Sequence, residues 1–153
     1  MFWQDVLLGC LVEDTALVHA VAAALGLADD SVRVVDAVSD LNTLDEAPAR
    51  VLVESSELKG EFPLHLSIYV RDSELARELR SSSATLDRVK RLCKRLRCPA
   101  LVSDDSLSPS AWLRVSPSRG VERVSLDAER LDHDEFVVAA AAPANLHETP
   151  LVP

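Results

Sequence analysis

Residues 64–71 alternate strictly between apolar and polar side chains, and this pattern restricts the fold more than any other feature of the chain. The apolar positions are Leu64, Leu66, Ile68 and Val70, and the polar positions are His65, Ser67, Tyr69 and Arg71. Because successive side chains of a β-strand point to opposite faces, the segment predicts a strand with one buried face. Such half-covered strands are typical of antiparallel sheets. We therefore expect a mainly antiparallel sheet with its core on one face.

The N-terminal part of the chain predicts a strand followed by a helix. Residues 6–12 are apolar apart from one glycine, which is typical of a central strand covered on both faces. A helix start at Asp14 or Thr15 follows, and Gly26 stands where a helix would end. Residues 16–25 carry no formal charge, so this helix should be largely buried.

Residues 84–97 predict a second helix with a divided surface. At about 100° per residue, its apolar side chains fall within an arc of about 120°, and cations occupy the rest. Asp87 lies in the expected first turn, and Pro99 prevents the helix from continuing. The helix should therefore pack on the sheet and expose a cationic side. Its apolar residues are Leu86, Val89, Leu92, Cys93 and Leu96, and its cations are Arg88, Lys90, Arg91, Lys94, Arg95 and Arg97.

Several short strands complete the predicted fold. The order of elements predicts an α+β fold: a mixed, mainly antiparallel sheet with two helices packed on it, a ferredoxin-like core and an added C-terminal hairpin. Strands are expected at 32–34, 50–54, 100–102, 111–116 and 121–126, with a loop at 36–50 and an edge strand at 136–139.

The size and composition of the chain suit one globular domain, with 153 residues of which 48% are hydrophobic and 27% charged. We assign residues 1–138 to a single α+β domain and the Ala/Pro-rich residues 139–153 to a flexible tail. The start lacks the features of a signal peptide, and no apolar stretch approaches the length of a membrane span. We therefore expect a cytoplasmic protein without membrane contact.

The cysteines and histidines do not predict a reactive centre. Cys10, Cys93 and Cys98 lack metal-type spacing and suit buried thiols in a reducing compartment. Cys10 is expected to be buried in mid-strand, which disfavours a catalytic pair with a histidine. His19 lies on the apolar helix and is expected to be a core histidine with satisfied hydrogen bonds.

The glycine pattern argues against nucleotide binding. The four glycines stand alone, whereas a loop that cradles phosphates needs several so that backbone N–H groups can approach the ligand. The Gly-x-Ser-x-Gly elbow of many hydrolases is missing as well. We expect no cofactor and no enzymatic activity.

Charge is unevenly distributed along the chain, whose net charge is −9. Residues 71–97 hold nine bases and four acids, a net charge of +5. Residues 1–70 hold three bases and twelve acids, and residues 98–153 hold four bases and nine acids. Such segregation acts on association with charged partners rather than on the fold.

The basic helix leaves two interpretations open. A regulatory or scaffold domain would bind an acidic ligand through residues 84–97, whereas a helix that merely solvates its cationic side explains the same residues. Nucleic-acid binding is disfavoured, because the whole chain is acidic and no aromatic residues are interleaved with the cations to stack on bases.

The predicted loop 36–50 carries a cluster of acids. An acidic surface steers a protein toward cationic partners and suppresses wrong ones. Asp36, Asp40, Asp45 and Glu46 are therefore candidate contacts to a protein partner, although acidic loops also simply keep proteins soluble.

Asp104 and Asp105 follow a predicted strand, where carboxylates often bind hard cations. With Asp36 or Asp40 as a third carboxylate they would suit a small metal-dependent enzyme. The favoured interpretation is that one of them caps the following turn, without a metal. Together with Trp112 they form a second candidate partner-binding patch.

The segment 98–113, CPALVSDDSLSPSAWL, resembles a segment of small acidic bacterial proteins of unknown or toxin-neutralising role. The resemblance implies an immunity protein, a cytoplasmic α+β domain that neutralises a co-encoded toxin by occluding it. It implies a protein partner such as a cationic toxin domain. The leading hypothesis is therefore a non-enzymatic protein-binding domain of this kind, and the sequence predicts no oligomeric state.

Overall fold

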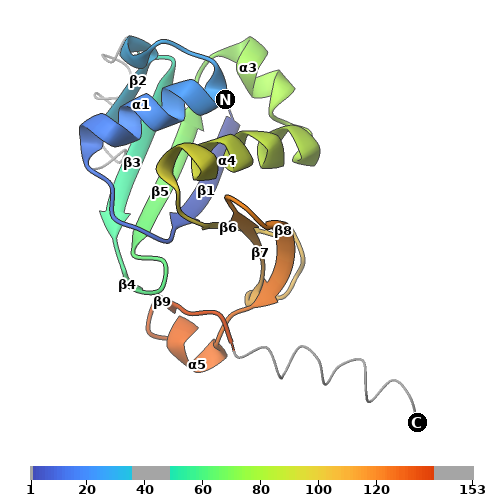
Figure 1. Cartoon of the computed structure of the whole chain (residues 1–153). Helices are drawn as coiled ribbons and strands as arrows, with labels where there is room; N and C mark the ends of the chain where they lie inside the picture. The colour runs from blue at the N-terminus through green and yellow to red at the C-terminus, as the bar shows by residue number, and fades with distance from the viewer. Residues whose placement is uncertain (1, 36–48, 140–153) are drawn as a thin grey trace.

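The computed structural model describes residues 2–35 and 49–139 (Figure 1). The predicted tail lies outside these ranges except for Ala139, and so does nearly all of the predicted loop 36–50. The described strands are β1 (Phe2–Leu8), β2 (Val32–Val35), β3 (Val51–Glu57), β4 (Lys59–Gly60), β5 (Leu64–Val70), β6 (Ala100–Ser103), β7 (Ala111–Ser116), β8 (Gly120–Ser125) and β9 (Glu135–Phe136). The described helices are α1 (Asp14–Leu25), α3 (Ser73–Glu78), α4 (Ser82–Leu96) and α5 (Ala128–Leu131), with a 3-10 turn η1 (Asp29–Ser31).

Seven strands form one sheet in the order β2-β3-β5-β1-β6-β7-β8 (Figure 1). Neighbouring strands are antiparallel, except for the parallel pair β2 and β3. The four strands β3-β5-β1-β6, with α1 after β1 and α4 before β6, form the ferredoxin-like core. The hairpin β7–β8 extends the sheet beyond β6. The predicted α+β fold, with its mixed and mainly antiparallel sheet, is therefore confirmed.

The main core lies between the sheet and the helices α1 and α4, which cross one face of it (Figure 1). Strand β5 is the alternating segment, and its residues Leu64, Leu66 and Val70 are buried on the helix side. The polar positions of β5 face the other way, as the period of two requires. Alternation in the sequence therefore identifies the covered face correctly.

Strand β1 lies at the centre of the sheet, but it covers residues 2–8 rather than the predicted 6–12. The chain bends at Gly9 and leaves the sheet, so the later apolar residues are not part of the strand. Val6 and Leu8 pack in the main core, whereas Leu7 packs in a second cluster on the opposite face. An apolar run indicates burial on both faces, but it does not show where the strand ends.

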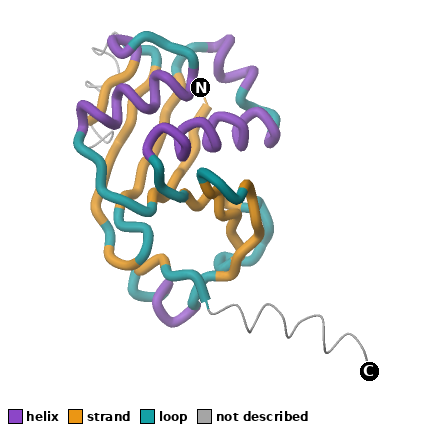
Figure 2. The backbone as a smooth tube through the Cα atoms, in the orientation of Figure 1, coloured by secondary structure: helices purple, strands orange, loops and turns teal. Residues whose placement is uncertain are grey.

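The second, smaller core lies on the face of the sheet away from α1 and α4. Figure 2 shows the hairpin β7–β8 bending away and the chain returning through α5 to the β4–β9 pair. Trp112 and Phe136 meet edge to face here, with ring centroids 5.7 Å apart. The predicted edge strand 136–139 is shorter than expected: β9 covers Glu135–Phe136 and pairs with β4, and Val138 adds only a single bridge to Leu126. The buried residues of this core are Leu7, Phe62, Leu101, Val124 and Leu126.

Side-chain caps begin three of the helices. Asp72, Ser81 and Asp127 each accept a hydrogen bond from the backbone N–H three residues further on. The Ser81 cap starts α4 two residues before the prediction, so Asp87 lies in the second turn rather than the first. The sequence does not predict α3 or α5, because six and four residues are too few to show a helical period.

We predict that Leu66→Ala lowers the free energy of unfolding by about 3 kcal/mol, because a fully buried leucine is lost and a cavity remains. The matched control is Leu107→Ala, whose side chain is 104% exposed and whose substitution should change stability by less than about 0.5 kcal/mol. Urea unfolding followed by circular dichroism measures both values. Equal effects of the two substitutions would contradict the core described above.

Candidate functional site

Cationic side chains of α4 gather where this helix packs beside α1. Arg91, Lys94 and Arg95 line a shallow depression together with Ala23 and Ala24 of α1. The depression has a volume of about 390 Å³ and is open to solvent. We call these five residues the cationic face.

The amphipathic spacing of α4 produces the cationic face. Val89, Leu92 and Cys93 are buried in the main core, so the positions between them point away from the sheet. The predicted division of this helix into an apolar and a cationic side is therefore confirmed, except at Arg88, whose side chain is largely buried. Ala23 and Ala24 of α1 leave the depression open, because their short side chains do not fill it.

Most of the positive charge of α4 is not neutralised by neighbouring acids. Arg91 forms an ion pair with Asp87 one turn away, with Nη2 and Oδ2 3.1 Å apart, but both side chains are more than half exposed. Exposed pairs of this kind contribute only about 0.3–0.5 kcal/mol. Among the described residues, Lys90, Lys94 and Arg97 have no ion pair. The helix therefore presents a net positive surface.

His19 connects α1 to the cationic face. Arg95 Nη2 donates a hydrogen bond to His19 Nε2 at 2.7 Å, and His19 Nδ1 lies 3.1 Å from Asp29 Oδ2. Because arginine only donates, this geometry requires a neutral imidazole whose Nδ1–H donates to Asp29. The expected core histidine is wrong: the side chain is 56% exposed, because α1 is covered only on the side that faces the sheet and α4.

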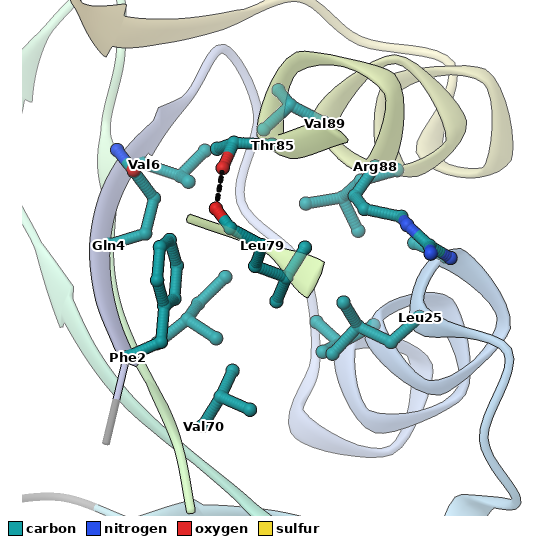
Figure 3. A pocket seen from close by; sticks show the side chains of 13 residues that line it. Phe2, Gln4, Val6, Leu25, Val70, Leu79, Thr85, Arg88 and Val89 are labelled. Atoms are coloured by element: carbon teal, nitrogen blue, oxygen red, sulfur yellow. Dashed lines mark hydrogen bonds between the residues drawn. The ribbon is translucent and has the colours of Figure 1, made fainter. Parts of the chain in front are cut away.

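Arg88 does not belong to the cationic face. Its side chain is only 17% exposed and pairs with Glu78 at the end of α3. It lines an apolar cavity between the helices and the sheet, beside Thr85, which donates to the Leu79 carbonyl oxygen at 2.7 Å (Figure 3). The cavity, at about 40 Å³, has room for only a few water-sized molecules. Arg88 and Thr85 therefore hold α3 and α4 together.

A polar cluster lies on the opposite face of the sheet, where β1 pairs with β5. Asp5 Oδ1 accepts hydrogen bonds from His65 Nε2 and from Ser67 Oγ, both at 2.9 Å. A nucleophilic triad would need the imidazole to accept the serine proton. Here Ser67 donates directly to the carboxylate, so the cluster joins the two strands and does not activate the hydroxyl. Alternation places these residues on one face, but it does not reveal which strands pair.

The polar cluster shifts the pKa values of its members in opposite directions. Burial acts to raise the pKa of Asp5, but the hydrogen bonds from His65 and Ser67 outweigh it, so the pKa lies below its usual value. The hydrogen bond to Asp5 raises the pKa of His65 against the opposing effect of burial, and the nearby Glu54 adds to the rise. The pair is therefore stabilised in its charged form.

Cys10 lies near Cys93 and Cys98 in the fold, although it is far from both in the sequence. Cys10 is half-buried after the end of β1, so the expectation of a buried mid-strand thiol is wrong. Cys93 on α4 and Cys98 after it are buried, as expected. Burial raises the pKa of Cys93 to about 12 and raises the pKa of Cys98 as well. Within residues 2–35 and 49–139, no three His, Cys, Asp or Glu side chains are placed to hold a metal ion.

Asp104 caps the turn that follows β6. Its Oδ1 accepts the Ser106 N–H at 2.9 Å, and its Oδ2 lies 3.6 Å from Arg123 Nε. The hydrogen bonds from Ser106, together with Arg123, hold the pKa of this carboxyl below its usual value. The side chain is only 2% exposed: Oδ1 caps the turn, whereas Oδ2 is buried without a hydrogen-bond partner among the described residues.

Asp105 and Trp112, the other members of the second predicted patch, differ in their exposure to solvent. Asp105 is exposed in the turn, with φ of 62°. Trp112 is partly buried, its Nε1 donates to the Pro109 carbonyl oxygen at 2.9 Å, and its ring packs in the second core. The structure therefore does not join them into one exposed surface. The other predicted contacts, Asp36, Asp40, Asp45 and Glu46, lie outside the described residues.

In the described part of the chain, no helix combines the length and the apolar character needed to cross a membrane. Comparison of the chain with protein-family models, curated proteins and solved structures found no significant match.

We predict that Asp5→Asn lowers the pKa of His65 toward its ordinary value, because the substitution removes the carboxylate that stabilises the imidazolium. With its raised pKa, His65 stabilises the fold below about pH 6.5, and this contribution is lost as the pH rises through that raised pKa. Asp5, with its lowered pKa, stabilises the fold above about pH 4, and its contribution is lost as the pH falls through that lowered pKa.

The wild-type protein should therefore gain stability from this pair mainly between about pH 4 and 6.5, and Asp5→Asn should flatten that dependence. NMR titration of His65 and urea unfolding at a series of pH values measure the two effects. Asp132→Asn, an exposed change of the same type, is the control. An unchanged His65 titration in Asp5→Asn would rule out the contact.

Proposed function

We propose that this chain is a non-enzymatic protein-binding domain that docks an acidic surface of its partner on the cationic face. The observation that supports this proposal is the depression formed by Arg91, Lys94 and Arg95 over the alanines of α1. Carboxylates of a partner would reach the three cations there, while the shallow alanine surface admits a backbone at close range. This function corresponds to the regulatory or scaffold domain predicted as an alternative from the sequence.

The charge distribution of the chain favours a protein over a nucleic acid as the partner. The chain has a net charge of −9, so its field as a whole repels a polyanion and attraction is confined to α4. The cationic face contains no aromatic residue on which a base could stack. A folded acidic protein meets the domain over a limited area, where local complementarity decides association.

A charge-reversal experiment tests this proposal. The variant Arg91→Glu, Lys94→Glu, Arg95→Glu should weaken binding of a fluorescein-labelled, glutamate-rich peptide at least tenfold, because repulsion replaces attraction at the depression. The salt dependence of binding should fall as well. Fluorescence anisotropy at two salt concentrations measures both.

The matched control reverses three exposed cations away from the cationic face: Arg33→Glu, Lys59→Glu, Arg119→Glu. It changes the net charge equally, so it separates a local docking site from a general effect of charge. Equal losses of affinity in both variants would show that the cationic face is not the docking site. Circular dichroism confirms that each variant is folded.

We also propose the immunity function, in which the chain occludes a co-encoded cationic toxin through its acidic residues. Two observations support it: the resemblance of residues 98–113 to toxin-neutralising proteins, and the excess of acids in residues 1–70. In this segment Asp105 is exposed, whereas Asp104 and Trp112 serve the fold. The acids at 36–46 would therefore supply most of the contacts.

For this second function we predict that Asp36→Asn, Asp40→Asn, Asp45→Asn, Glu46→Gln weakens binding of a lysine-rich peptide and lowers its salt dependence. The control neutralises four exposed acids elsewhere: Glu13→Gln, Asp30→Asn, Glu57→Gln, Glu129→Gln. Isothermal titration calorimetry with the same peptide compares the two variants. Unchanged affinity in the first variant would exclude these acids as contacts.

A further inference from the structure

Cys10 follows the end of β1 and Cys98 precedes the start of β6, at the place where these two strands pair. The antiparallel register pairs Leu7 with Leu101 and Leu8 with Ala100. Gly9 N donates to the Pro99 carbonyl oxygen at 2.8 Å, which carries the pairing one step further. Cys10 and Cys98 are the next residues beyond this hydrogen bond, just outside the two strands.

The spacing at this position suits a disulfide. In a regular antiparallel pair, the residues next to such a hydrogen bond have Cα atoms about 4.5 Å apart, and Cys10 and Cys98 occupy that position just beyond the strands. Disulfides join Cα atoms about 4.4–6.8 Å apart. A Cβ atom on Gly9 would lie 2.9 Å from Pro99 Cγ, so the two chain segments approach closely. Burial chiefly raises the pKa of Cys98, and the neighbouring Cys10 thiol adds to the rise, as expected for two thiols that lie close together.

The three thiols differ in their access to solvent. Cys10 is half-buried and reachable, whereas Cys98 is only 5% exposed. Cys93 is fully buried, and its Sγ donates to the Val115 carbonyl oxygen at 3.6 Å. An oxidant therefore meets Cys10 first, and Cys98 is the thiol placed across the strand pair to react next.

We propose that Cys10 and Cys98 form a reversible redox pair that closes to a disulfide when the protein meets a hydroperoxide. The Cys10 thiolate attacks the peroxide oxygen, the O–O bond breaks, and an alcohol or water leaves with the thiol proton, giving a sulfenic acid. The Cys98 sulfur attacks the Cys10 sulfur and expels water. In sum, two thiols and one hydroperoxide give one disulfide, one water and one alcohol, or a second water from hydrogen peroxide.

The disulfide acts on stability more than on shape. It joins segments that are already paired, so the native fold needs little rearrangement. It also closes a long loop between residues 10 and 98, which restricts the unfolded chain. Oxidation therefore stabilises the domain, and reduction by a dithiol reverses the change. This inference does not depend on which partner the cationic face binds.

The test treats the full chain with hydrogen peroxide, quenches it and counts free thiols in denaturant. The three thiols of the reduced protein should fall to one, with a mass loss of two hydrogen atoms and a higher midpoint of urea unfolding that dithiothreitol reverses. Peptide mapping should identify a Cys10–Cys98 link. Cys10→Ser and Cys98→Ala should each abolish the link, and Cys93→Ala should retain it.

Other results would overturn the proposal. These are three thiols that remain titratable after oxidation, a link that includes Cys93, a disulfide between two chains on a non-reducing gel, or irreversible gain of oxygen at Cys10 without a link. If the Cys10→Ser variant does not fold, Cys98→Ala tests the same prediction, because it removes the other partner of the disulfide. Circular dichroism of the reduced proteins establishes that the compared variants are folded.

Discussion

The architecture depends on β1 being covered on both faces at the centre of the sheet. Val6 and Leu8 pack toward α1 and α4, and Leu7 packs toward the hairpin, so one short strand connects both cores. A polar side chain in such a strand must be satisfied, because a buried unpaired group is costly. Asp5 meets this requirement through His65 and Ser67 on the neighbouring strand. The polar cluster is therefore a consequence of the position of β1 rather than an isolated reactive centre.

Sequence patterns predict the elements whose burial has a clear period. The alternation in β5 and the apolar stripe of α4 identify the covered faces correctly, because strands repeat every two residues and helices every 3.6. Patterns without a period fail in understandable ways. The apolar run that predicts β1 continues past Gly9, where the chain leaves the sheet. The helices α3 and α5 are too short to show a period, and the structure reveals them together with their side-chain caps.

The candidate sites are harder to predict from the sequence than the helices and strands. The cations of α4 are visible in the sequence, but the alanines of α1 that complete the depression are not, because they depend on how two helices pack. Cys10 and Cys98 have no informative spacing in the sequence, since their proximity arises from the pairing of β1 with β6. Asp104 and Trp112 suggested a surface patch, yet a turn and an aromatic contact explain their positions.

The position of α4 connects these observations and bears on how a partner would bind. Near its start the helix is held by the Thr85 hydrogen bond to Leu79 and by the Arg88–Glu78 pair. Just beyond its end, the contact between Gly9 and Pro99 fixes the chain to β1. The backbone of the cationic face is thus held from both ends before any partner arrives. Preorganisation of this kind lowers the entropic cost of association, so that cost falls mainly on the long cationic side chains. The docking surface that we propose on α4 would therefore be held in place by the same contacts that build the fold.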